Sequence, residues 1–172
     1  RDMFLRTIAG LSTSIIIGLL AAGVSSLLAL ALGAIAALGG PKADAVITWL
    51  VDLMMGIPHI VLLILISYAC GKGVLGVTVG VALTHWPNLT RVIRAEILQL
   101  KESDFVAQAQ HLGASRLQIA RNHMLPYVLP QFIVGLVLMF PHAILHEASV
   151  TFLGFGLSPD VPGCRRGRGY KR

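Results

Sequence analysis

Long stretches without charged residues alternate with short polar segments along the chain, and this pattern predicts membrane-crossing helices. A crossing helix needs about 20 mostly apolar residues to traverse roughly 30 Å of hydrocarbon. The pattern predicts four spans, at residues 12–38, 47–70, 73–89 and 126–146. The expected fold is therefore an all-α, polytopic membrane protein. The alternative, a set of helices buried inside a large soluble protein, is disfavoured because too few polar segments remain to cover four apolar ones.

Small residues recur every four positions within the apolar stretches. They form three rows: Gly18, Ala22 and Ser26; Ala29, Gly33 and Ala37; Gly76 and Gly80. In lipid, small residues at this spacing let two helix backbones approach closely. The rows predict a packed bundle rather than isolated membrane anchors.

The polar segment at about residues 90–125 is expected to form short structured helices on one side of the membrane. Ser103 and Asp104 offer a helix start, and Gly113 is expected to end that helix. Ser115 is placed to cap a further short helix. That helix is expected to end before Pro126, since a proline disfavours the α conformation of the residue before it.

Composition supports lipid as the main solvent. Apolar residues make up 55% of the chain and charged residues only 13%, and the mean hydropathy is +0.77. This balance excludes a disordered chain, and two cysteines are too few for a disulfide scaffold. Residues 157–172 carry +4 of the net charge of +6, so the basic pI gives no argument for nucleic-acid binding.

Lysine and arginine in the loops predict the orientation. Residues 90–122 and the loop at 39–46 together hold more basic residues than the opposite loops, which places the 90–125 segment in the cytoplasm. The basic residues of 160–172 then fall on the wrong side of the membrane. We therefore expect that tail to be non-native or disordered, or to follow a missing helix.

No catalytic motif is present in the sequence. Lys42 and Lys72 lack the glycine spacing of a nucleotide-binding loop, and the metal and nucleophile motifs CxxC, HExxH and GxSxG do not occur. The chain is therefore not expected to be an enzyme.

Residues 105–126, FVAQAQHLGASRLQIARNHMLP, resemble the EAA loop of ABC-transporter permeases, the segment that engages the ATPase. The residues that match the loop pattern are Ala109, Gly113, Ile119, Leu125 and Pro126. The chain departs from the pattern at Ala107, which stands where the family has glutamate. The resemblance implies that these six positions couple the permease to its ATPase.

Other segments resemble the peptide and nickel permease subfamily. They are Arg1-Asp2, Ile57-Pro58, the run from His85-Trp86 through Arg91 and Arg94, and EASVTFLGFGL at 147–157. The resemblance covers residues 1–159 and implies a partial permease transmembrane domain, truncated at both ends, with its coupling loop at about 90–125.

The resemblance also implies a function and a set of partners. The chain would be a multi-pass subunit of the bacterial inner membrane, surrounded by lipid, that forms half of an importer's pore. Its partners would be a second permease, two ATPase subunits that bind ATP, and a periplasmic binding protein; the chain itself would bind no cofactor. Nickel, free or chelated, and di- or oligopeptides are the two candidate substrates. A non-transporting membrane scaffold or a relic fragment is the alternative.

Four histidines, His59, His85, His142 and His146, lie in or at the edge of the apolar stretches, and His85, His142 and His146 are candidates for the substrate path. Polar groups within a membrane are costly and tend to face a cavity or a partner. His142 and His146 are four residues apart, so they share a helix face and could offer two imidazoles to a metal ion in transit. Nickel permeases commonly carry histidine at the positions that resemble His85 and His146. The alternative is that these residues hydrogen-bond neighbouring helices.

Overall fold

The computed structural model describes residues 2–71 and 73–154, and this part of the chain is helical without strands. The elements are α1 (Asp2–Leu38), α2 (Pro41–Gly56), α3 (His59–Ala69), α4 (Val74–Lys101), α5 (Asp104–His111), α6 (Arg116–Ile119), the π-helix η1 (Ala120–Met124) and α7 (Leu125–Phe152). The predicted all-α fold is confirmed. The basic tail at 160–172 lies outside the described residues, so its expected disorder stays a prediction.

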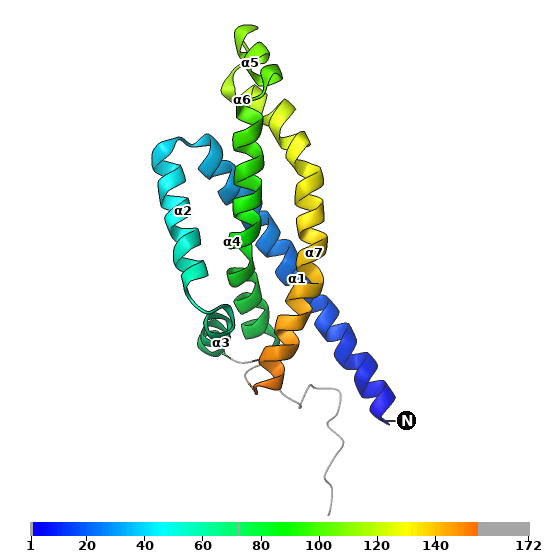
Figure 1. Ribbon diagram of the computed structural model, residues 1–172. Coiled ribbons are helices and arrows are strands. Elements are labelled where there is room, and N and C mark those ends of the chain that lie inside the picture. Colours follow the sequence, from blue (N-terminus) through cyan, green and yellow to red (C-terminus); the bar gives the residue numbers. More distant parts are fainter. Residues whose placement is uncertain (1, 72, 155–172) are drawn as a thin grey trace, which may run out of the picture.

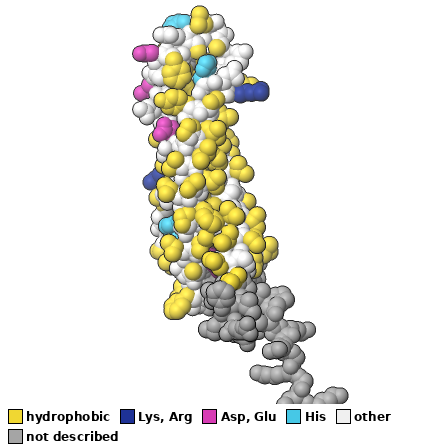
Figure 2. Space-filling model, turned by 90° about the vertical axis from the view of Figure 1, so that its right-hand side faces the viewer, with side chains coloured by type: hydrophobic (Ala, Val, Ile, Leu, Met, Phe, Trp, Pro, Cys, Tyr) yellow, Lys and Arg dark blue, Asp and Glu magenta, His cyan; other side chains and the backbone are white. Residues whose placement is uncertain are grey.

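The long helices form an elongated bundle with short helices at its two ends (Figure 1). Helix α4 contacts α1, α2, α3 and α7, and α1 also packs against α7. Helices α5 and α6 lie beyond one end of the bundle, and α3 lies at the other (Figure 1). Figure 2 shows hydrophobic side chains over much of the face that it presents, with charged side chains gathered toward the end that carries α5 and α6.

The number of membrane spans is close to the prediction but not equal to it. In the described residues, two helical segments are long and apolar enough to cross a membrane, Gly10–Leu38 and Leu117–Phe152. Helices α2 and α3 pass the same test only together, as a pair bent by 94°. The expected count of four is therefore approximate.

The expected span at 47–70 is not one continuous helix, because the chain turns sharply in its middle. Helix α2 ends at Gly56, Ile57 takes an extended conformation, and α3 begins at His59 directly after Pro58. Proline has no backbone N–H and disfavours the α conformation at the residue before it. Ile57-Pro58 therefore separates the two helices.

The first part of the expected polar segment continues the preceding helix, because α4 runs without interruption to Lys101. The charged residues beyond position 90 lie on a helix that packs against α2 rather than in a loop. Arg91 pairs with Asp52, and Arg94 pairs with Asp44. The connection between α4 and α5 begins at Glu102.

The sequence predicts that the last short helix ends before Pro126, but in the structure the helix continues past this residue. Helix α6 passes through η1 into α7, and the Leu125 N–H donates to the Ala120 carbonyl, five residues earlier. The wider π turn lies where the ring of Pro126 would otherwise meet the carbonyl of an α-helix. The chain thus stays helical from Arg116 to Phe152.

Small residues let α1 and α3 approach α4 closely, as the spacing of these residues predicted. Ala22, Ala29 and Ala37 on α1 are each at most 2% exposed. A Cβ added to Gly33 would lie 2.8 Å from Ile93 Cγ2 on α4, and one added to Gly76 would lie 2.6 Å from the Ser67 carbonyl oxygen on α3. Both contacts are too close for any larger side chain without movement of a helix.

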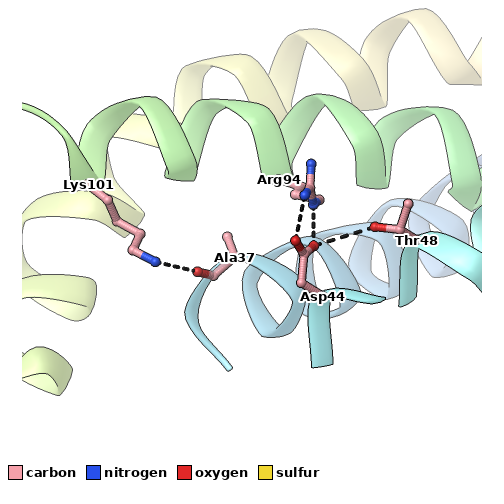
Figure 3. A network of polar contacts seen from close by, with 5 residues as sticks. All are labelled: Ala37, Asp44, Thr48, Arg94 and Lys101. Atoms are coloured by element: carbon pink, nitrogen blue, oxygen red, sulfur yellow. Dashed lines mark hydrogen bonds and ion pairs between the residues drawn. The ribbon is translucent and has the colours of Figure 1, made fainter. Parts of the chain in front are cut away.

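Polar contacts hold the turn between α1 and α2 against α4 (Figure 3). The Arg94 guanidinium donates two hydrogen bonds to the Asp44 carboxylate, and the distance from Nη2 to Oδ2 is 2.6 Å. Thr48 Oγ1 donates to Asp44 Oδ1 at 3.4 Å, and Lys101 Nζ donates to the Ala37 carbonyl at 3.0 Å. We call these five residues the polar clasp. It fixes the α5–α6 end of the bundle.

The close contact at Gly33 leads to a paired test on α1. Gly33→Ala should lower the free energy of unfolding by about 1–3 kcal/mol, because the new methyl group overpacks the contact with Ile93 and Thr90. Gly23→Ala is the matched control, since no atom lies within 4 Å of a Cβ there. It should be neutral or stabilise by up to about 1 kcal/mol through helix propensity. Thermal unfolding of the purified complex in detergent measures both, and equal effects at the two sites would contradict the packing.

The polar clasp leads to a double-mutant cycle. Asp44→Ala and Arg94→Ala should each destabilise the protein, and the double variant should reveal a coupling energy of about 1 kcal/mol, since the pair is bidentate but roughly one-third exposed. The same cycle on Asp52 and Arg91, whose side chains are about half exposed and joined by one hydrogen bond, should give a smaller coupling. Thermal unfolding gives both energies. Additive effects at Asp44 and Arg94 would show that the clasp is not stabilising.

Candidate functional site

The segment formed by α5, the turn after it and α6, residues 104–119, projects beyond the end of the bundle (Figure 1). Helix α5 begins at Asp104, as predicted, and its acidic first residue suits the positive end of the helix dipole. The predicted end is also confirmed. Gly113 has a φ of 85°, and the Ala114 N–H donates to the Ala109 carbonyl at 3.0 Å. This Schellman-type ending requires a left-handed residue, which glycine adopts without strain.

The start of α6 is closed by a reciprocal pair of hydrogen bonds. The Gln118 N–H donates to Ser115 Oγ at 3.3 Å, and the Ser115 N–H donates to Gln118 Oε1 at 3.0 Å. This is a capping box, and it confirms the predicted capping role of Ser115. Both helices of residues 104–119 are thus terminated by specific contacts, which makes the segment a defined element rather than a loose tether.

The six predicted coupling residues fall into two groups. Ala107, Gly113, Leu125 and Pro126 are exposed, whereas Ala109 is half-buried and Ile119 is only 2% exposed. Ala109 and Ile119 pack against or within the main hydrophobic core, so they anchor the segment to the bundle.

Sequence reasoning missed one anchor in this segment, and the structure shows two strongly exposed leucines beside it. Val106 is fully buried and joins the same core, although it is the immediate neighbour of the position that the motif singled out. Leu112 and Leu117 are 88% and 78% exposed, respectively. The segment thus presents apolar side chains to its surroundings from a buried base.

Four histidines from three helices meet in the other half of the bundle. His59 is the first residue of α3, His85 lies on α4, and His142 and His146 lie on α7. The ring centroids of His59 and His146 are 4.4 Å apart, those of His59 and His85 4.7 Å, and those of His85 and His146 5.1 Å. We call these four residues the histidine cluster.

The structure brings the sequence-predicted histidines together and adds one. His142 and His146 share a face of α7, and their Nε2 atoms are 3.0 Å apart. His85 lies beside both of them, with ring centroids 5.3 Å and 5.1 Å away. His59 was not among the predicted site residues. Its place in an apolar stretch was the available signal, but only the bend between α2 and α3 carries it to the other three.

Potential metal ligands in the cluster are already arranged as a group. One ring nitrogen from each of His59, His85 and His146 lies within 4.8 Å of the other two. In the described part of the chain, Nδ1 of His59 and Nε2 of His85 are buried without a hydrogen-bond partner. The cluster can therefore bind a cation or hydrogen-bond a ligand.

Comparison with known proteins identifies a family and relatives that are similar to this chain. Residues 14–160 match the family described as binding-protein-dependent transport system inner membrane component. A putative peptide permease of Brucella ovis is 36% identical over 161 residues, which cover 94% of this chain and 53% of the relative. The oligopeptide transport system permease OppC of Bacillus subtilis is 31% identical, over 91% of this chain and 52% of the relative. The chain thus spans about half the length of the curated relatives that it matches.

A solved structure has a similar fold. The MetNI methionine ABC transporter, solved in inward-facing conformations, matches with a TM-score of 0.80 at 17% identity, over 91% of this chain and 78% of that chain. The structural likeness shows the fold, and the family match over most of the sequence shows the relationship. The chain belongs to the binding-protein-dependent transport system inner membrane components, the permease family of ABC importers.

Proposed function

We propose that the chain forms half of the translocation pore of an ABC importer in the bacterial inner membrane, which it crosses several times. A second permease supplies the other half, and two ATPase subunits bind and hydrolyse ATP. A periplasmic binding protein delivers the substrate. The chain itself binds no cofactor and carries out no covalent chemistry.

The observation that carries this proposal is the way in which residues 104–119 are folded and attached to the bundle. The segment is closed by a glycine turn and a capping box, and Val106 and Ile119 fix it to the core. It follows α4 after a short connection and continues through η1 into α7. A push on such an element moves two bundle helices together, as coupling of ATP hydrolysis to alternating access requires.

Each predicted coupling residue has a place in this proposal. Ala107 and Gly113 leave a small, exposed surface for close approach of the ATPase, beside the exposed Leu112 and Leu117. Ala109 and Ile119 transmit the force to the core. Leu125 and Pro126 begin α7, where the motion enters the bundle. A non-transporting scaffold would not need a segment that transmits force to the bundle.

Two substrate classes remain in the proposal, each with its own support. The names of the relatives favour di- or oligopeptides. The intramembrane histidines favour nickel, alone or chelated, as cargo, with His85, His142 and His146 along its path. Imidazole is a good ligand for Ni²⁺, and His142 and His146 are the ligands that the sequence indicated.

Transport by the reconstituted complex tests the proposal. Full complexes in proteoliposomes should accumulate either labelled peptides or ⁶³Ni²⁺ when binding protein and ATP are supplied. The control is a complex whose ATPase subunits cannot hydrolyse ATP, which should accumulate neither. If the intact, ATP-hydrolysing complex moves no member of either class, the proposed function fails.

Gly113 gives a sharper test of coupling. Gly113→Leu forces a branched side chain into a left-handed conformation, at a cost of roughly 1–2 kcal/mol, and places it on the proposed docking surface. Substrate-stimulated ATP hydrolysis should fall by about tenfold. Gly113→Asn is the matched control, because asparagine tolerates the left-handed region and no atom lies within 4 Å of the new Cβ. It should keep most of the stimulation. Full stimulation in the leucine variant would remove Gly113 from the coupling role.

A further inference from the structure

We propose that His59, His85 and His146 form a binding site for a divalent first-row transition-metal ion, and that His142 is an accessory ligand at its exposed edge. The inference rests on the proposed function in one respect only, the placing of the site on a transport path. Binding of the ion depends on the geometry of the histidine cluster alone.

The ligand atoms are close to the spacing that a metal requires. Metal–imidazole bonds of about 2.0–2.1 Å place two ligand nitrogens no more than about 4.2 Å apart. The three nitrogens of His59, His85 and His146 all lie within 4.8 Å of one another. The group therefore has to tighten by only a few tenths of an ångström to surround an ion.

His85 is held in the tautomer that a metal ligand needs. Its Nδ1 lies 2.8 Å from the Val81 carbonyl oxygen, one turn back along α4. A carbonyl only accepts, so Nδ1 carries the hydrogen and Nε2 carries a free lone pair. A hydrogen bond of this kind also fixes ring orientation, as it does for ligating histidines generally.

No hydrogen-bond donor in the described part of the chain reaches the free lone pair of His85. The residue is 6% exposed, and its Nε2 is buried without a hydrogen-bond partner. His59 Nδ1 is buried and unpartnered as well. A buried polar atom without a partner costs about 1–3 kcal/mol, and here two such atoms lie in one cluster of imidazoles. Simple packing of the rings leaves both costs in place, whereas a bound cation removes them.

His142 differs from the other three histidines in its exposure. It is exposed at the surface of the chain, and its Nε2 lies 3.0 Å from Nε2 of His146. In the absence of an ion, one of these two nitrogens donates to the other. His142 can take an arriving ion and pass it to His146, so that the accessory ligand connects the buried group to the outside.

The ligand set indicates which ions fit. The described metal-ligand group contains imidazoles alone, without carboxylate or thiolate. Imidazole suits Ni²⁺, Cu²⁺ and Zn²⁺, while Mg²⁺ and Ca²⁺ prefer oxygen ligands. Neutral ligands leave the charge of the ion uncompensated, which favours release and is appropriate for an ion in transit.

Metal binding to the permease–ATPase complex tests the site. The complex is purified without a polyhistidine tag and without binding protein, and Ni²⁺ alone is the probe, measured by equilibrium dialysis. The parent should bind one more Ni²⁺ per copy of this chain than the His59→Gln, His85→Gln, His146→Gln triple variant. Each single variant should weaken that binding by roughly a hundredfold or more, because loss of a ligand should cost at least as much as the loss of up to about a hundredfold that follows removal of a ligand's hydrogen-bond partner. His142→Gln should have a smaller effect, and Mg²⁺ should not compete.

Controls separate ligand loss from misfolding. His111→Gln removes an exposed histidine at the far end of the bundle and should leave Ni²⁺ binding unchanged. X-ray absorption at the nickel edge should show the scattering pattern of several imidazoles in the parent, and a loss of imidazole in His59→Gln. If a variant at His85 fails to assemble, His59→Gln and His146→Gln still decide the matter.

The outcomes distinguish the site from the proposed function. Equal Ni²⁺ binding by the parent and the triple variant would overturn the site, and ATP-driven peptide uptake by the same complexes would leave the permease proposal standing. Ni²⁺ bound by imidazoles in a complex that transports neither substrate class would support the site and overturn the transport proposal. ATP-driven ⁶³Ni²⁺ uptake that the triple variant loses would support both.

Discussion

Close approach of α4 to its neighbours is the constraint on which the rest of the structure depends. Lipid gives helices no hydrophobic reason to associate, so association relies on tight packing between surfaces of small residues. Gly33 admits Ile93 of α4 on one side, while Gly76 and Gly80 of α4 lie against the backbone of α3 on the other. Because α4 occupies this central place, it positions both the polar clasp at one end and the histidine cluster in the other half of the bundle.

The two candidate sites depend on α4 in different ways. At one end, Arg94 and Lys101 hold the turn between α1 and α2, and the segment at 104–119 starts directly beyond them. In the other half, α4 supplies His85 between the histidines of α3 and α7. A force applied to residues 104–119 therefore acts on the same helix that carries a histidine of the proposed ion site. This shared helix connects the proposed coupling segment to the proposed ion site.

Local rules accounted for the start and end of several helices but not for the long ones. Gly113 and Ser115 act through neighbours within a few residues, so their roles were readable from the sequence. The extent of α4 was not, because its charged residues find partners on α2, about forty or fifty positions away in the chain. The prediction that a helix ends before Pro126 was wrong for a related reason, because a π turn accommodates the proline within a continuous helix. A charged residue or a proline predicts the end of a helix only where no ion-pair partner and no local change of helix geometry accommodates it.

The sequence by itself determined the class of the protein, because long uncharged stretches have one stable arrangement in lipid, the helix whose backbone groups pair internally. It also determined the pairing of His142 with His146, which depends only on the period of a helix. The tertiary structure alone decided the burial of Val106 and Ile119 and the place of His59 in the histidine cluster. Those features depend on where separate helices meet. That meeting is set by the bend after Gly56 and by which rows of small residues face a neighbour, and the spacing along one helix does not specify that neighbour.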